Sequence, residues 1–115
     1  TGKYLTIVEQ DEGRRYFKAF IADRLDGPWE AIADSSDHPF ASWRNVRAAK
    51  GVAPWTDNIS HGELIRDGSD QSMTVDPQDL QFIFQGMLEA HKSGKNYGQF
   101  QWRIGLLTPA NNNDN

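Results

Sequence analysis

The side chain best suited to acid–base chemistry in this 115-residue chain is Glu9. It follows Leu5 and Ile7 on one face of an alternating apolar segment, where desolvation disfavours a charged carboxylate and raises its pKa. A raised pKa suits a general acid. A carboxylate at the end of a strand that simply reaches water fits the same pattern, and the pattern alone favours that simpler interpretation.

A second candidate group surrounds His61. In residues 59–66 the side chains alternate, so His61 and Glu63 share one face and could address one ligand or ion. A buried, hydrogen-bonded histidine is the commoner explanation of such a position. Asp57 and Asn58 add oxygen donors nearby, but without the spacing of a helix-loop calcium site, so spacing gives only a weak indication of a metal.

Four aromatic residues lie in or beside predicted loops: Trp43, Trp55, Tyr97 and Trp102. Such rings could stack on the apolar faces of sugars, although most pack in the interior. We assign at least three of the four to packing. The adjacent Arg14 and Arg15 lie beside a turn, which predicts a solvated hairpin end. The chain has no cysteine, no G-x-S-x-G segment and no glycine-rich phosphate loop. Covalent acyl chemistry and nucleotide binding therefore have no support.

Composition indicates a soluble globular chain, with 37% hydrophobic and 24% charged residues. The net charge is -4 and the basic residues are scattered, so no nucleic-acid partner is expected. No segment approaches the roughly 20 apolar residues that span a bilayer, so no membrane partner is expected either.

Period-two alternation and turn signals predict an all-β fold. A largely buried strand over residues 3–9 forms a hairpin with residues 14–22, and a long surface loop over 35–58 separates two groups of strands. The other predicted strands are 29–33, 59–66, 72–75, 80–85 and 101–107. A helix over residues 77–92 is the weaker alternative. Residues 109–115 are predicted to be a disordered polar tail. Seven or so short strands suit a sandwich or two propeller blades.

Several segments, in order along the chain, resemble the C-terminal half of the α-L-arabinofuranosidases of glycoside hydrolase family 62. They are residues 3–9 (KYLTIVE), 14–17 (RRYF), 25–29 (LDGPW), 55–67 (WTDNISHGELIRD), 73–77 (MTVDP), 80–86 (LQFIFQG) and 103–108 (RIGLLT). The resemblance implies a five-bladed β-propeller, of which residues 1–108 supply roughly the last two blades of the catalytic domain. The preceding N-terminal part of the propeller would then be the partner that this chain lacks.

The resemblance also implies an inverting hydrolysis of arabinofuranosyl side chains on arabinoxylan or arabinoxylo-oligosaccharides, by a secreted, extracellular enzyme. Glu9 matches the general acid. The general-base aspartate and a second aspartate that tunes the acid have no match in this chain. Inversion requires two carboxyl groups roughly 6.5 to 9.5 Å apart, so the base would lie on the absent segment.

The remaining implied site residues are His61 and Tyr97. His61 resembles a histidine near the central channel, where a calcium ion is commonly held close to the sugar site, and Tyr97 falls where a tyrosine lines the substrate cleft. Gly98 replaces an asparagine often found beside that tyrosine, and Gln78 replaces a cysteine, so the disulfide of some relatives cannot form. Two other functions remain open: a non-catalytic carbohydrate-binding or interaction module, and a related propeller glycosidase acting on arabinan or xylo-oligosaccharides.

Overall fold

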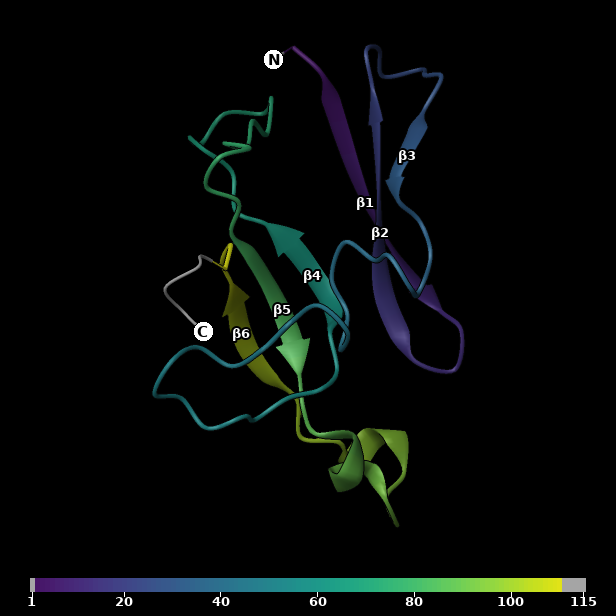
Figure 1. Cartoon of the computed structure of the whole chain (residues 1–115), viewed down its shortest axis with the longest axis vertical. Coiled ribbons are helices and arrows are strands. Elements are labelled where there is room, and N and C mark those ends of the chain that lie inside the picture. The colour runs from purple at the N-terminus through teal and green to yellow at the C-terminus, as the bar shows by residue number, and fades with distance from the viewer. Residues whose placement is uncertain (1, 111–115) are drawn as a thin grey trace.

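The computed structural model describes residues 2–110, which form six strands in two antiparallel sheets of three (Figure 1). The first sheet has the order β1-β2-β3, with β1 at Tyr4–Asp11, β2 at Arg15–Ala22 and β3 at Glu30–Ala33. The second has the order β4-β5-β6, with β4 at Ser60–Leu64, β5 at Phe82–Gly86 and β6 at Arg103–Leu107. Two 3-10 helices, η1 at Glu89–Lys92 and η2 at Tyr97–Gln99, lie between β5 and β6.

The β1–β2 hairpin places Glu9 opposite Phe17 and Asp11 opposite Arg15. Its turn contains Gly13 with a φ of 92°, a left-handed conformation that glycine adopts without a steric cost. The hairpin thus forms because two alternating segments are joined by residues suited to a tight turn. It brings the end of β1 and the start of β2 to the same end of the first sheet (Figure 1).

The core lies between the two sheets and is built largely from phenylalanine rings. Phe17 of β2 and Phe82 of β5 are 3% and 2% exposed, and their rings meet edge to face with centroids 4.9 Å apart. Phe40, from the loop between β3 and β4, packs on the same Phe82 ring at 5.6 Å. Burying a phenylalanine side chain contributes about 1.5–3 kcal/mol. These contacts therefore hold the two sheets together and set how their ends meet.

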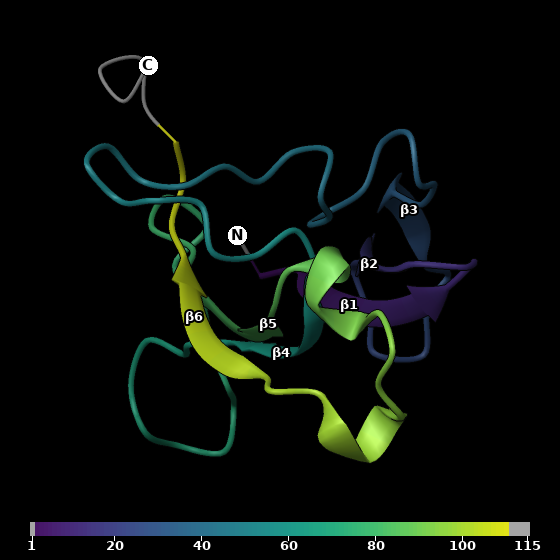
Figure 2. The ribbon, with the colours of Figure 1, turned by 90° about the horizontal axis from the view of Figure 1, so that it is seen from below.

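The long loop over residues 35–58 crosses from the first sheet to the second (Figure 2), as predicted. It is not entirely a surface loop, because Ala41 and Ser42 are buried. The Phe17 amide donates to the Ala41 carbonyl at 2.9 Å, and the Phe40 amide donates to the Phe17 carbonyl at 2.8 Å. Phe40 and Ala41 of the loop are thus paired with Phe17 of β2.

Two predictions of local structure were wrong. The strand β1 is half-exposed rather than largely buried, because it is the edge strand of its sheet and pairs only with β2 within the described residues. Residues 72–75 form no strand: the Asp70 carboxylate accepts hydrogen bonds from the Ser72 amide and hydroxyl, and this local bonding replaces strand pairing. The weaker alternative, a helix over 77–92, does not form: residues 82–86 are the strand β5, close to the favoured strand over 80–85, and only Glu89–Lys92 is helical, as the 3-10 helix η1.

Within residues 2–110 there is no α-helix, and no helix long and apolar enough to cross a membrane. Most of the predicted tail, residues 111–115, lies outside the described residues.

Candidate functional site

Glu9 lies at the end of β1, where the start of β4 meets it. Its Oε2 atom accepts hydrogen bonds from the Ser60 hydroxyl at 2.9 Å and from the His61 amide at 3.2 Å. Its Oε1 atom lies 2.7 Å from Nδ1 of His61. The Glu9 side chain is 23% exposed, so this carboxyl is held in place by the second sheet while one side still faces solvent.

His61 reaches Glu9 because β4 is irregular at this point. The register of β4 against β5 shifts between Ser60 and Glu63, and His61 has a φ of 30°. The next residue, Gly62, passes so close to β5 that an added Cβ would lie 2.6 Å from the Ile83 carbonyl oxygen and closer still to the Phe82 ring. A bulge of this kind turns a side chain away from regular alternation. The predicted shared face of His61 and Glu63 is therefore broken, and only His61 contacts Glu9.

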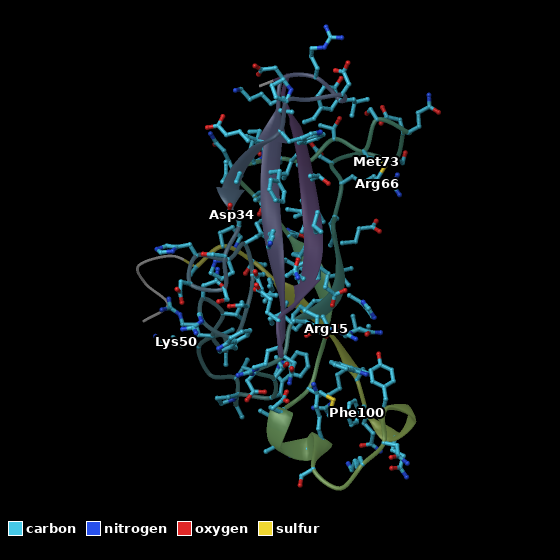
Figure 3. All side chains as sticks on the ribbon, turned by 90° about the vertical axis from the view of Figure 1, so that its right-hand side faces the viewer. Arg15, Asp34, Lys50, Arg66, Met73 and Phe100 are labelled. Atoms are coloured by element: carbon cyan, nitrogen blue, oxygen red, sulfur yellow. The ribbon has the colours of Figure 1, made fainter. Side chains whose placement is uncertain are left out.

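Arg15, the first residue of β2, joins the members of the site. Its Nη1 atom donates to the Ser60 hydroxyl at 2.8 Å and lies 3.8 Å from Oε2 of Glu9. The same atom is 3.5 Å from Nε2 of His61, and the guanidinium carbon lies 6.0 Å from the centre of the Tyr97 ring. Figure 3 shows Arg15 at the end of the hairpin, close to the segment that carries Phe100.

Tyr97 lies on η2, in a loop anchored by Lys92. The Lys92 ammonium group lies 5.4 Å from the ring centres of both Phe100 and Trp102, and it donates to the Asn58 side-chain oxygen at 3.3 Å. The Tyr97 ring packs against Phe100 with centroids 5.4 Å apart, yet Tyr97 remains 58% exposed. An exposed ring on an anchored loop beside the carboxyl can stack on a sugar.

The other three aromatic rings singled out from the sequence are packed. Trp55 stacks on Phe84 at 5.8 Å, and Trp102 meets the edge of Phe100 at 6.3 Å. Trp43 lies under the Arg14 guanidinium at 4.3 Å. All three are half-buried, so Tyr97 alone of the four offers a mostly exposed ring.

The pKa of Glu9 moves in the opposite direction from the sequence prediction. Burial raises it, but the hydrogen bonds from the His61 amide, the Ser60 hydroxyl and the His61 ring, together with the charge of His61, bring it below 4.5, the value of an unperturbed glutamate. The prediction considered desolvation alone. Donors that stabilise the carboxylate outweigh it, so the surroundings described here favour the ionised form.

The described residues do not by themselves fit calcium. No group of three or more histidine, cysteine or acidic side chains in residues 2–110 could hold a metal ion. Calcium binds six to eight oxygen ligands, whereas the His61 ring contacts Glu9 through Nδ1 and faces the Arg15 guanidinium through Nε2. Asp57 and Asn58 are instead engaged with the chain: Asp57 accepts from the Glu89 amide at 2.7 Å, and Asn58 donates to the Met87 carbonyl at 3.0 Å.

Sequence reasoning missed Ser60 and Arg15. Arg15 was interpreted as a solvated hairpin end, yet its side chain is 30% exposed and bonds to a residue 45 positions away. Alternation along β2 could have separated Arg15 from Arg14, because consecutive strand residues point to opposite faces. Arg14 indeed reaches elsewhere and donates to the Asp57 carbonyl.

Comparison with known proteins places this fold among glycosidases. The catalytic domain of a family 62 α-L-arabinofuranosidase from Coprinopsis cinerea superimposes with a TM-score of 0.81 and 40% identity, over 94% of this chain and 33% of that one. An α-L-arabinofuranosidase from Podospora anserina, solved with cellotriose, gives a TM-score of 0.81 and 38% identity, over 96% and 34% of the two chains. A family 62 hydrolase solved with xylotriose gives 0.79 and 39%, over 92% and 32%.

A curated relative, α-L-arabinofuranosidase C of Cellvibrio japonicus (strain Ueda107), is 45% identical over 106 residues, which are 91% of this chain and 16% of that protein. The chain therefore spans about a third of the solved domains and about a sixth of this relative.

Fold and relatives together define the class: the two sheets are roughly two blades of a five-bladed β-propeller of the glycoside hydrolases. The sequence model described as glycosyl hydrolase family 62 matches residues 1–108. The chain belongs to that family, and the predicted family and fold class are confirmed.

Proposed function

We propose that this chain supplies the general acid, Glu9, to an inverting α-L-arabinofuranosidase that removes arabinofuranosyl side chains from arabinoxylan. The observation that carries the proposal is the set of three contacts that fix the Glu9 carboxyl between the two sheets, from Ser60 and from the amide and ring of His61. Membership of the family supports the reaction class. The substrate follows from the resemblance, and from relatives solved with xylotriose and cellotriose.

In the proposed reaction, Glu9 protonates the glycosidic oxygen as the bond to the anomeric carbon breaks. A water molecule attacks the opposite face of the sugar and loses its proton to an aspartate outside this chain. The two carboxyl groups must then lie roughly 6.5 to 9.5 Å apart. A general acid is protonated before it acts, whereas the surroundings of Glu9 described here lower its pKa. A second carboxylate from the rest of the propeller would raise that pKa by like-charge repulsion.

We assign substrate contacts to Tyr97 and His61, the mostly exposed ring and the half-exposed imidazole beside Glu9. Calcium near His61 would need oxygen ligands from outside the described residues, since Arg15 faces the free ring nitrogen. Arabinoxylan is a polymer outside the cell, so the proposed substrate requires a secreted enzyme.

The test is the Glu9→Gln variant of the complete catalytic domain that contains this chain, assayed for arabinose release from arabinoxylan. We expect a fall in kcat of roughly 10²- to 10⁴-fold, because a positioned general acid contributes about that much. The matched control is Glu30→Gln, which removes an exposed carboxylate on β3. Retention of most activity by Glu9→Gln would contradict the proposal, and xylan binding without turnover by the unmodified domain would favour a carbohydrate-binding module.

A further inference from the structure

Arg15 lies beside every member of the proposed site. It donates to the Ser60 hydroxyl, lies 3.8 Å from the Glu9 carboxyl and 3.5 Å from the His61 ring, and faces the Tyr97 ring at 6.0 Å. These partners come from β1, β4 and η2, whereas Arg15 starts β2. One guanidinium therefore connects three elements that are far apart along the chain.

The directions of these hydrogen bonds follow from the chemistry of the groups. A guanidinium only donates, so the Ser60 oxygen accepts from Arg15 and its own hydrogen is directed to Oε2 of Glu9, 2.9 Å away. A neutral His61 ring can likewise present the lone pair of Nε2 to Arg15, 3.5 Å away. The ring proton is then on Nδ1 and points to Oε1 of Glu9 at 2.7 Å. Arg15 thereby orients both side chains that hold the carboxyl.

We propose that Arg15 is a positioning residue for the general acid, acting through the Ser60 hydroxyl and the His61 ring, and that it also keeps Tyr97 beside the acid. This inference rests on the proposed function of Glu9. Because Arg15 carries several donors in one rigid plane, it can serve Ser60, His61 and the Tyr97 ring together. A lysine presents a compact charge and cannot hold the same geometry, so Arg15→Lys should replace it only in part.

The test uses two arabinosides with different leaving groups, assayed with the complete catalytic domain. Release of arabinose from arabinoxylan leaves a sugar hydroxyl, which must take a proton from the acid as the bond breaks, whereas an aryl arabinofuranoside can expel a stable phenolate and needs the acid little. For Arg15→Met we expect kcat on arabinoxylan to fall roughly 10- to 100-fold, since small misplacements of a catalytic group cost about that much. The kcat of the aryl reaction should change little, and the kcat of Arg15→Lys on arabinoxylan should fall between those of Arg15→Met and the wild type.

The matched control is Arg24→Met, which removes an exposed arginine whose described partner is Asp26 in the turn before β3. If Arg15→Met does not fold, Ser60→Ala breaks the same connection and should also slow arabinoxylan more than the aryl substrate. Equal losses on both substrates would overturn the proposal, as would unchanged activity in Arg15→Met. If Glu9→Gln keeps its activity, the proposed function itself fails. If Glu9→Gln loses activity but Arg15→Met does not, only the proposed role of Arg15 fails.

Discussion

Nδ1 of His61 lies 2.7 Å from Oε1 of Glu9, although the two residues are 52 positions apart in the chain. The contact exists because the bulge in β4 turns His61 toward the end of β1, while phenylalanine packing holds the two sheets at that spacing. The carboxyl of one blade is thus held by the backbone and side chains of the next. The geometry of the proposed site therefore depends on the packing between blades as much as on either sheet alone.

The first prediction concerns the His61 ring. Of the two neutral tautomers of the ring, we expect the metal-free chain to favour the one with its proton on Nδ1, because the Arg15 guanidinium faces Nε2 and can only donate. Nitrogen NMR distinguishes the two tautomers by the shifts of the protonated and bare nitrogens. In Arg15→Met we expect a mixture of tautomers. A proton on Nε2 in the unmodified chain would contradict the bonding described here.

The second prediction is a pH dependence of stability that comes from Glu9. Its pKa is lower in the folded chain than the 4.5 of an unperturbed glutamate, so its stabilising effect is present above that pH and is lost as the pH falls through the folded value. The free energy of unfolding should therefore differ between wild type and Glu9→Gln at about pH 7, and this difference should shrink at about pH 3. Urea titrations at both pH values measure it, and a constant difference would refute the assignment.

How far the sequence predicts this structure differs between features. The β1–β2 hairpin follows from alternation and a turn, and both are local. The failure at residues 72–75 arises because Asp70 bonds to Ser72, which a strand pattern does not reveal. Glu9, His61 and Tyr97 were singled out from residue type and pattern and received their expected roles from the family resemblance, but their common contact, Arg15, was not identified. The partners of Arg15 lie on β1, β4 and η2, and a single sequence gives no signal of which residues meet between blades.

The third prediction concerns Gly62, which follows His61 in the bulge. A methyl group there would meet the Phe82 ring and the Ile83 carbonyl, so Gly62→Ala should cost roughly 1–3 kcal/mol of stability, as overpacked sites do. The control is Gly98→Ala, because a Cβ at Gly98 has open space around it. Thermal unfolding of both variants measures the effect. Equal stability of the two would mean that the close approach of β4 to β5 is not tight.

The fourth prediction is a loss of stability in alkali through Tyr16. This side chain is buried. A hydrogen bond to the Glu12 carboxylate is the main cause that raises its pKa from 10.0 to about 12, and desolvation is the second. The unfolded chain gives up the phenolic proton at a lower pH than the folded chain. The contribution of Tyr16 to the free energy of unfolding is therefore fully present below pH 10.0 and should fall as the pH rises toward about 12. Tyr16→Phe cannot titrate, so its unfolding free energy should decline less over that range. Parallel urea titrations of the two proteins measure the difference, and identical alkaline profiles would show that Tyr16 is not the group responsible.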